Sequence, residues 1–389
     1  MLVKRTKPIS PSKIGLFDDC RLRYIAESEG VVGSRLPAGP AAYIGIAVHS
    51  TIESLVGRSN LEMGLIRSVL TESLSALLAS PKKSSLVSHA AFQRFGLRGV
   101  VPQARILSLC GYVKDVLDRL PQQAGSHKPS PSTTASPASQ LGIEKWVASE
   151  SLGMAGRIDY SYLDEGGSLR VVDFKTGRVT GEDGAPKPGY LMQIAAYGLM
   201  LRESMTISNV RLRLESPRGS WEGDLTPELE NRVRYAARVI NRSLPFEKYF
   251  EMEAIATPGE HCASCSVRPS CAKYLSALSK GETGAAFPAI PVGDLFGKVI
   301  YIKAIDGLVK VQLERPDIGR VTVTGIPEPI WSGSMGDAVF MFSLRTNEPQ
   351  MRARYVANFH VLDVAQPQGS AFESLITQAS SDLPLLGNG

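Results

Sequence analysis

Residues 156–177, GRIDYSYLDEGGSLRVVDFKTG, constrain the fold of this 389-residue chain more than any other stretch. Gly166-Gly167 is a strong turn signal, and apolar residues alternate with polar ones before it. The segment after the turn is rich in β-branched residues, as strands are. The stretch therefore predicts an antiparallel β-hairpin.

The predicted hairpin carries a carboxylate on each strand. An antiparallel hairpin of this length brings Asp159 close to Asp173, and Lys175 projects with Asp173 because side chains two residues apart share a face of a strand. Two carboxylates and an ammonium group that converge can hold a divalent cation and orient a water molecule, as metal-assisted hydrolysis of a phosphodiester requires. An isolated Asp-x-Lys is more often a solvated strand face, so this interpretation depends on the rest of the chain.

Helices are predicted on both sides of the hairpin. Before it, residues 12–27, 42–56, 60–79 and 103–120 repeat apolar side chains at helical spacing, which predicts a helical N-terminal third. After it come a helix at 191–201, a strand at 210–214 and a long helix at 227–244. This order of elements predicts an α/β core with a mixed sheet.

Composition divides the remainder of the chain. Residues 121–140 are rich in Pro, Ser, Thr and Ala and are expected to be a flexible insertion, because they cannot bury enough apolar surface to become ordered. Residues 276–290 are rich in Ser, Gly and Ala and are expected to be a linker. Alternating apolar residues then predict an all-β barrel of about five strands at 291–365, of the oligonucleotide-binding (OB) or SH3-like type, before a tail at 366–389.

The cysteines have a spacing typical of a metal site. Cys262, Cys265 and Cys271 form C-x2-C-x5-C, in which the first pair can direct two thiolates at one centre, and Cys20 could supply a fourth sulfur. Four thiolates suit tetrahedral zinc or a [4Fe–4S] cluster, and spacing alone does not separate the two. A disulfide is less expected because the sequence shows no export signal.

Three motifs in order, Gly-x-Ile-Asp, Asp-x-Lys and Gln-x-x-x-Tyr, resemble the PD-(D/E)XK nuclease superfamily, specifically its RecB-like exonuclease branch. The resemblance covers residues 10–275 and implies a restriction-endonuclease-like core for a nuclease domain at 1–275. The cysteine arrangement is similar to the iron–sulfur nucleases of this branch, such as the CRISPR-adaptation and AddB-type nucleases. It therefore implies a [4Fe–4S] cluster, although the usual Cys-Pro is Cys20-Arg21 here.

The same resemblance assigns roles to the site residues. It implies that His49, in GIAVHSTIE, and the Phe174 carbonyl join Asp159 and Asp173 as ligands of Mg²⁺ or Mn²⁺, hard cations that prefer oxygen ligands. Lys175 would orient or deprotonate the attacking water.

Further residues around the motifs are candidates for supporting roles. The helix residues Gln193 and Tyr197, which share a face, would position the phosphate backbone or the lysine. Nearby basic residues are candidate phosphate contacts: Arg157, Arg178 and Lys187. Two acidic residues on the strand before the hairpin could reach the outer shell of the site, but no motif includes them: Glu144 and Glu150.

The net charge of +5 is unevenly distributed. Residues 1–275 hold 34 Lys and Arg against 27 Asp and Glu, which predicts a basic face for a polyanionic partner such as DNA. Residues 276–389 hold 9 against 11, so the barrel is expected to contact proteins or guide DNA. Since no apolar run could span a bilayer and the N-terminus lacks an apolar signal region, no membrane association and a cytoplasmic location are expected.

These observations predict a metal-dependent deoxyribonuclease, most simply an exonuclease on single strands or duplex ends, in DNA repair, recombination or anti-phage defence. The alternative is a non-catalytic DNA-binding or assembly subunit, which would not need to keep His49, Asp159, Asp173 and Lys175 together. A zinc-stapled transcription module is disfavoured because there is no recognition-helix signature. The chain has no Walker-type phosphate loop, and relatives often act beside a helicase, ATPase or defence protein, so such a partner is expected.

Overall fold

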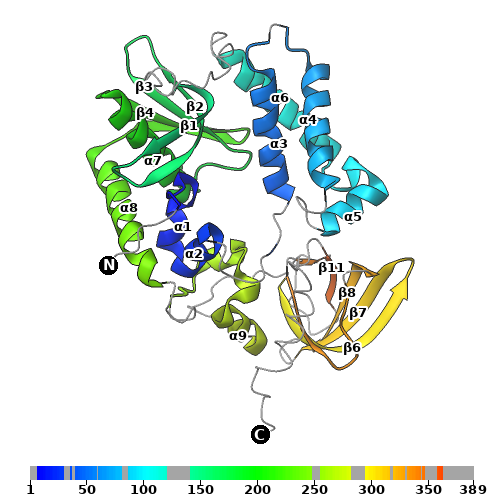
Figure 1. Ribbon diagram of the computed structural model, residues 1–389. Coiled ribbons are helices and arrows are strands. Elements are labelled where there is room, and N and C mark those ends of the chain that lie inside the picture. Colours follow the sequence, from blue (N-terminus) through cyan, green and yellow to red (C-terminus); the bar gives the residue numbers. More distant parts are fainter. Residues whose placement is uncertain are drawn as a thin grey trace. The chain divides into compact units, whose positions relative to one another are not determined.

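The computed structural model resolves two compact units, which are described separately (Figure 1). The first unit comprises Met1–Ser28, Ala41–Ala76 and Val101–Glu251, and the second comprises Glu29–Pro40, Leu77–Val100 and Met252–Gly389. The residues that the structure describes are 7–29, 36, 40–58, 60–80, 86–120, 141–247, 255–281, 294–315, 319–328, 331–342, 344–346 and 357–361.

The centre of the first unit is a five-stranded mixed sheet in the order β1-β2-β3-β4-β5. Its strands are β1 (Gly142–Ser149), β2 (Met154–Leu163), β3 (Leu169–Phe174), β4 (Val210–Ser216) and β5 (Gly219–Asp224). Neighbouring strands are antiparallel except β3 and β4, which are parallel. The mixed sheet is therefore confirmed, and β5 is an additional strand that the sequence pattern did not reveal.

The predicted hairpin is formed by β2 and β3. Its turn closes where the Asp164 N–H donates to the Ser168 carbonyl at 3.0 Å, and the Asp164 carboxylate accepts the Ser168 N–H at 2.9 Å. Gly167 has a φ of 74°, in the left-handed region that glycine adopts without strain. The glycine pair thus marks the turn, as expected.

Helix α7 (Pro188–Met205) crosses over between the parallel strands β3 and β4, because parallel neighbours cannot be joined by a tight turn. It packs against the sheet and is buried along most of its length. A Cβ atom at Gly198 would lie 2.9 Å from Leu212 Cδ2, so glycine permits the close approach of helix and sheet. Helices α8 (Pro227–Glu247) and α1 (Ile14–Asp19) pack against α7.

The N-terminal segment is broken into two helices rather than the single predicted one. After η1 (Pro11–Lys13), α1 ends before Cys20, and α2 (Arg21–Glu29) begins after it. Cys20 has an extended backbone with φ −160° and ψ 118°. The interruption leaves the apolar spacing nearly intact, which is why the pattern gave no sign of it.

The remaining helices of the N-terminal third confirm the predicted helical part. They are α3 (Pro40–Leu55), α4 (Met63–Leu78) and α6 (Gln103–Arg119). Two elements that the sequence did not predict, α5 (Leu86–Phe95) and η2 (Leu97–Gly99), belong to the second unit.

The second unit contains a curled six-stranded sheet in the order β10-β11-β8-β7-β6-β9. Its strands are β6 (Leu295–Ile305), β7 (Leu308–Arg315), β8 (Gly319–Pro327), β9 (Ala338–Met341), β10 (Leu344–Thr346) and β11 (Ala357–Val361). The pairing is antiparallel except between β8 and β11. Its core is aliphatic, and an all-β C-terminal part is confirmed, whereas the OB-like or SH3-like type stays a prediction.

The cysteine-rich segment leads into this sheet through α9 (Ala272–Lys280). This helix includes residues 276–280 of the expected linker, and it buries Tyr274, Ala277 and Leu278. Residues 282–290 of that linker, the insertion at 121–140 and the tail at 366–389 lie outside the described residues. The expected domain boundaries stay a prediction.

A buried ion pair fixes the start of β6 to the cysteine-rich segment. Asp294 accepts hydrogen bonds from Arg268 Nε at 2.5 Å, from Arg268 Nη2 at 3.2 Å and from the Tyr274 hydroxyl at 2.7 Å. Arg268 Nη1 donates to the Cys265 carbonyl at 2.8 Å. The two buried charges therefore neutralise each other, and both are hydrogen-bonded.

Candidate active site

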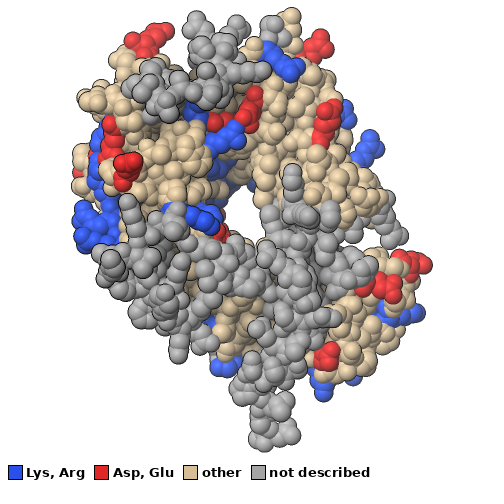
Figure 2. Space-filling model, in the orientation of Figure 1, with Lys and Arg blue, Asp and Glu red and all other residues tan. Residues whose placement is uncertain are grey.

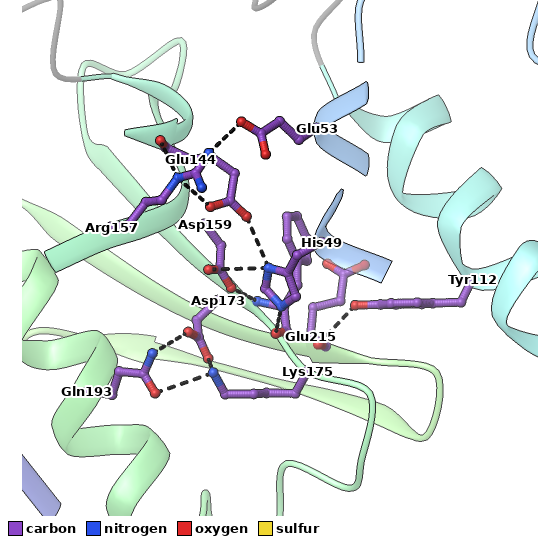
Figure 3. Close-up of polar contacts among 11 residues, drawn as sticks. His49, Glu53, Tyr112, Glu144, Arg157, Asp159, Asp173, Lys175, Gln193 and Glu215 are labelled. Atoms are coloured by element: carbon purple, nitrogen blue, oxygen red, sulfur yellow. Dashed lines mark hydrogen bonds and ion pairs between the residues drawn. The ribbon is translucent and has the colours of Figure 1, made fainter. Parts of the chain in front are cut away.

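The predicted metal ligands meet where α3 faces β2 and β3 (Figure 3). His49 Nε2 lies 3.1 Å from the Phe174 carbonyl oxygen, and His49 Nδ1 lies 3.6 Å from Asp159 Oδ1. The Phe174 N–H donates to Asp159 Oδ2 at 2.7 Å. The backbone of Phe174 therefore contacts both His49 and Asp159.

The register of the sheet explains why carboxylates gather here. β2 pairs Tyr160 with Val172, so the next position along the ladder sets Asp159 opposite Asp173. On its other side, β2 pairs with β1 in a register that sets Glu144 opposite Asp159. Acidic side chains from three adjacent strands consequently lie at the same level of the sheet.

Glu144 is a site residue that the sequence motifs did not assign. Its Oε1 lies 3.1 Å from His49 Nδ1, and ligand atoms of His49, Glu144 and Asp159 all fall within 4.8 Å of one another. Glu144 has a φ of 52°, which is rare for a non-glycine residue in a strand and costs about 1–3 kcal/mol. Glu150, the other candidate, is exposed in the turn after β1.

Lys175 and Gln193 form a hydrogen-bonded set with Asp173 (Figure 3). Lys175 Nζ lies 2.5 Å from Asp173 Oδ2 and donates to Gln193 Oε1 at 3.3 Å. Gln193 Nε2 donates to Asp173 Oδ1 at 2.9 Å. Because Asp173 is only 2% exposed, the amide and the ammonium group together fix a buried carboxylate.

Tyr197 lies one turn after Gln193 on α7 and is buried against β2. A Cβ atom at Gly156 would lie 2.7 Å from the Tyr197 hydroxyl and 2.9 Å from Pro11 Cδ. Glycine at the start of the first motif is therefore required for Tyr197 to occupy this position. Burial, followed by the charges of Asp159 and Asp173, raises the pKa of Tyr197, so the phenol stays protonated.

The electrostatics of the site show an excess of buried negative charge. Burial, followed by the neighbouring charge of Asp173, raises the pKa of Asp159 to about 7. Burial disfavours the imidazolium form of His49, but the hydrogen bond to Glu144 and the Asp159 charge outweigh it and raise the pKa of His49 to about 9. Burial likewise disfavours the Lys175 ammonium, but Asp173 and Asp159 raise its pKa, so Lys175 keeps its proton.

This constellation occurs in a chain whose residues 8–272 match the family model of the PD-(D/E)XK nuclease superfamily. The chain belongs to this superfamily. Phosphodiester hydrolysis is the reaction of such nucleases, and divalent metals are their typical cofactors.

Two solved structures that match this superfamily member are distant from it in sequence. A candidate exonuclease from Eubacterium rectale is 12% identical, with a TM-score of 0.34, and the match covers 61% of this chain and 79% of that one. The protein SSO0001 is 14% identical, with a TM-score of 0.25, and the match covers 59% of this chain and 95% of that one. A comparison with curated proteins gives no match.

The candidate phosphate contacts of this PD-(D/E)XK protein differ in their surroundings. Arg157 pairs with Glu53 on α3, and its Nε lies 2.9 Å from Glu144 Oε2 (Figure 3). Arg178 and Lys187 are exposed. Figure 2 shows Lys and Arg interspersed with Asp and Glu, and on the side drawn the described residues form no continuous basic face. The phosphate-binding roles therefore stay predictions.

Two further elements support the lysine, and the motifs did not identify them. The Lys175 N–H donates to the Glu215 carbonyl of β4 at 2.8 Å, and the Tyr112 hydroxyl of α6 donates to the same oxygen at 3.1 Å. The Glu215 side chain pairs with Arg119 and Arg213. These contacts pass through backbone atoms and distant ion pairs, which leave no short motif in the sequence.

The three C-terminal cysteines of the superfamily member lie in η5 (Glu260–Ser264) and the residues up to α9. Cys265 is buried, and Cys262 and Cys271 are half-buried and pack against a cluster of buried residues that includes Tyr274, Leu278 and Phe342. Cys20, in the first unit, is buried.

The described helices include none long and apolar enough to cross a membrane.

Proposed function

We propose that this chain is a metal-dependent deoxyribonuclease of the RecB-like branch that hydrolyses phosphodiester bonds in single-stranded DNA or at duplex ends. The observation that carries the proposal is the convergence of Glu144, Asp159 and Asp173 with His49 and Lys175 inside a PD-(D/E)XK scaffold. A structural ion-pair network would balance these charges, whereas here burial, followed by the charge of Asp173, raises the pKa of Asp159.

The donor set fits Mg²⁺ or Mn²⁺. His49, Glu144 and Asp159 would hold the ion, and Asp173 and the Phe174 carbonyl would supply further oxygens. Carboxylate and carbonyl oxygens are the preferred ligands of hard cations, and the buried negative charge of this site favours one. Such a cation, when bound, polarises the phosphate and lowers the pKa of a water molecule.

The protein's own contribution centres on Lys175. As an ammonium group it donates hydrogen bonds, so it would orient the attacking water or stabilise negative charge on the phosphate as the bond breaks. Gln193 holds both Lys175 and Asp173, which limits their freedom before substrate arrives. Tyr197 packs beside Gly156 of β2 and would keep α7 at the correct depth.

Arg157 is the most favourably placed of the proposed phosphate contacts. Its guanidinium already pairs with Glu53 and Glu144 beside the ligand set, so a substrate phosphate would replace the exposed partner Glu53. Arg178 and Lys187, which are exposed, would contact phosphates farther along the strand.

The cysteines support a second cofactor. We infer that Cys262, Cys265 and Cys271 bind a [4Fe–4S] cluster, with Cys20 as the fourth thiolate that the resemblance implies, and that zinc is the alternative. A role in DNA repair, recombination or defence, beside a helicase, ATPase or defence-system partner, completes the proposal.

The test is cleavage of end-labelled single- and double-stranded DNA with Mn²⁺ by anaerobically purified protein. Wild type should cleave, Lys175→Ala should not, and Lys114→Ala, which removes a half-buried lysine paired with Asp118 on α6, should behave as wild type. Tight DNA binding without cleavage by the wild type would favour a non-catalytic assembly subunit instead. The absorbance spectrum of the same sample reports the cluster: visible iron–sulfur bands support it, and a colourless protein with stoichiometric zinc excludes it.

A further inference from the structure

Trp146 is an exposed aromatic residue beside the candidate active site. Its side chain is 66% exposed on β1, although tryptophan is highly buried on average. The two other tryptophans, Trp221 and Trp331, are half-buried. A large apolar ring left in water next to a catalytic site is a candidate ligand contact.

The sheet register places this ring on the same face as the metal ligands. Trp146 pairs with Arg157, and Glu144 and Asp159 lie two residues away on the same two strands. Directly paired residues on neighbouring strands share a face of the sheet, and so do side chains two residues apart on a regular strand. Trp146 therefore projects to the same side as Arg157 and Asp159. At about 3.4 Å per residue, the Arg157 and Asp159 positions are about 7 Å apart along β2, the length of about two stacked nucleotides.

Helix α3 passes the same end of the site. His49 and Glu53 are four residues apart and share a face of α3, where His49 lies beside Glu144 and Glu53 pairs with Arg157. Arg157, the proposed phosphate contact, faces Trp146 across the β1–β2 ladder. It therefore lies between Trp146 and the metal ligands. A strand whose phosphate lies near Asp159 and Arg157 would bring a neighbouring base to the indole.

We propose that Trp146 stacks on an unpaired base next to the scissile phosphate, which selects single-stranded or frayed DNA as the substrate class. This inference rests on the proposed nuclease function and names its substrate. Aromatic stacking accepts every base because every base has a π face, so the contact would not select sequence. A base inside an intact duplex is already stacked on its neighbours and would have to be unpaired first.

The surroundings of the ring favour a base over a protein partner. β1 is an edge strand, and an exposed tryptophan on an edge can also anchor a protein interface. However, its cross-strand neighbour Arg157 and the nearby Asp159 on the same face are charged, whereas the core of a protein interface is depleted of charge. A single ring among charged groups matches the base-and-phosphate pattern of a nucleic acid strand.

The test measures binding separately from cleavage. Fluorescein-labelled oligothymidylate and a blunt duplex of equal length are titrated by anisotropy against Lys175→Ala protein, with Ca²⁺ as the divalent ion. Trp146→Ala should weaken single-strand binding about 5- to 140-fold, equivalent to about 1–3 kcal/mol for one stacked base. Trp146→Phe should restore much of it, and blunt-duplex binding should change less than twofold.

The matched control is Tyr235→Ala on α8, which removes an aromatic ring that is 67% exposed, and it should leave single-strand binding unchanged. Unchanged single-strand affinity in Trp146→Ala, or equal losses on single strands and blunt duplex, would overturn the stacking proposal. So would a change of oligomeric state in Trp146→Ala, measured by light scattering, because it would assign the ring to a protein interface. If the wild type cleaves no DNA and the Lys175→Ala protein binds none, the proposed function itself fails.

Discussion

The two units both bury charged side chains, but the balance of charge differs. In the second unit, Asp294 and Arg268 form an ion pair whose polar atoms bond to each other, to Tyr274 and to a backbone carbonyl. In the first unit, three carboxylates converge on a histidine and a lysine, with the exposed Arg157 beside Glu144, and repulsion between Asp159 and Asp173 remains.

This difference separates a structural ion pair from a site prepared for a ligand. Removing one partner of a buried ion pair leaves the other charge buried and unpaired, so the stability of the protein depends on the pair. A site with surplus negative charge instead lowers the stability of the protein in the absence of a cation, and this loss is relieved when a cation binds. The first unit should therefore lose function before stability on mutation, and the second should do the reverse.

The largest effect is expected for Lys175→Met, which keeps the length of the side chain and removes its charge. Cleavage should fall on the order of 10²- to 10⁴-fold, because the proposed donor to the water or phosphate is lost. Initial rates on labelled DNA, with circular dichroism to verify folding, provide the measurement. A variant that unfolds, or one that cleaves at the wild-type rate, would contradict the contrast between the units.

Asp294→Ala should have the opposite signature. It leaves the buried Arg268 guanidinium without its carboxylate, so the second unit should lose about 3–5 kcal/mol of unfolding free energy in urea. The exposed Glu314 of β7 is the control, and Glu314→Ala should change stability by less than about 0.5 kcal/mol. Equal effects of the two substitutions would show that the buried pair is not structural.

The pH dependence of stability in the Asp159→Asn variant tests the surplus negative charge of the site. The pKa of Asp159 is about 7 in the folded state and lies above its unfolded value of about 3.9, so the stabilising contribution is complete below pH 4 and is lost as pH rises through 7. Metal-free wild type should therefore weaken over this window. Asparagine should remove that dependence and stabilise the metal-free protein at pH 8 by about 1–3 kcal/mol.

Thermal unfolding with and without Mn²⁺ measures the stability of the metal-free and of the metal-bound protein. Mn²⁺ should stabilise the wild type at pH 8 and have much less effect on Asp159→Asn. A metal-free variant that is less stable than wild type at pH 8 would mean that Asp159 is a structural carboxylate, like Asp294.

The smallest effect is expected at Tyr197, which we compare with a second buried tyrosine, Tyr274. Tyr274→Phe deletes a hydrogen bond to the Asp294 carboxylate and should cost about 1.5–3 kcal/mol in urea unfolding. Tyr197→Phe keeps the ring that packs beside Gly156 and should change stability by less than about 0.5 kcal/mol. Similar losses of stability in both variants would show that the Tyr197 hydroxyl also makes a hydrogen bond that stabilises the fold.

The sequence predicted the parts of the site that depend on local periodicity. The turn at Gly166-Gly167 and the alternation around it were sufficient to set Asp159 near Asp173 and Lys175. Helical spacing placed Gln193 and Tyr197 on one face of α7, and α7 does carry Gln193 to Lys175. These relations follow from the period of a single element or from one tight turn.

The parts that the sequence did not predict depend on contacts between distant segments. Glu144 reaches His49 through the register of β1 and a left-handed backbone at one residue, which no periodicity encodes. The bond from Tyr112 to the Glu215 carbonyl joins segments 103 residues apart. The break at Cys20 is a change in the backbone conformation of one residue, and it leaves the apolar spacing nearly intact.

The parallel pairing of β3 with β4 has a consequence for how a newly made chain becomes active. The β2–β3 hairpin closes over a short turn, so Asp159 and Asp173 can meet early. The Glu215 carbonyl and Gln193 reach Lys175 only after the crossover between residues 174 and 210 has closed, and long-range parallel pairing is intrinsically slow. During refolding, native hairpin signals should precede the recovery of cleavage, and the interval between them would time the docking of α7.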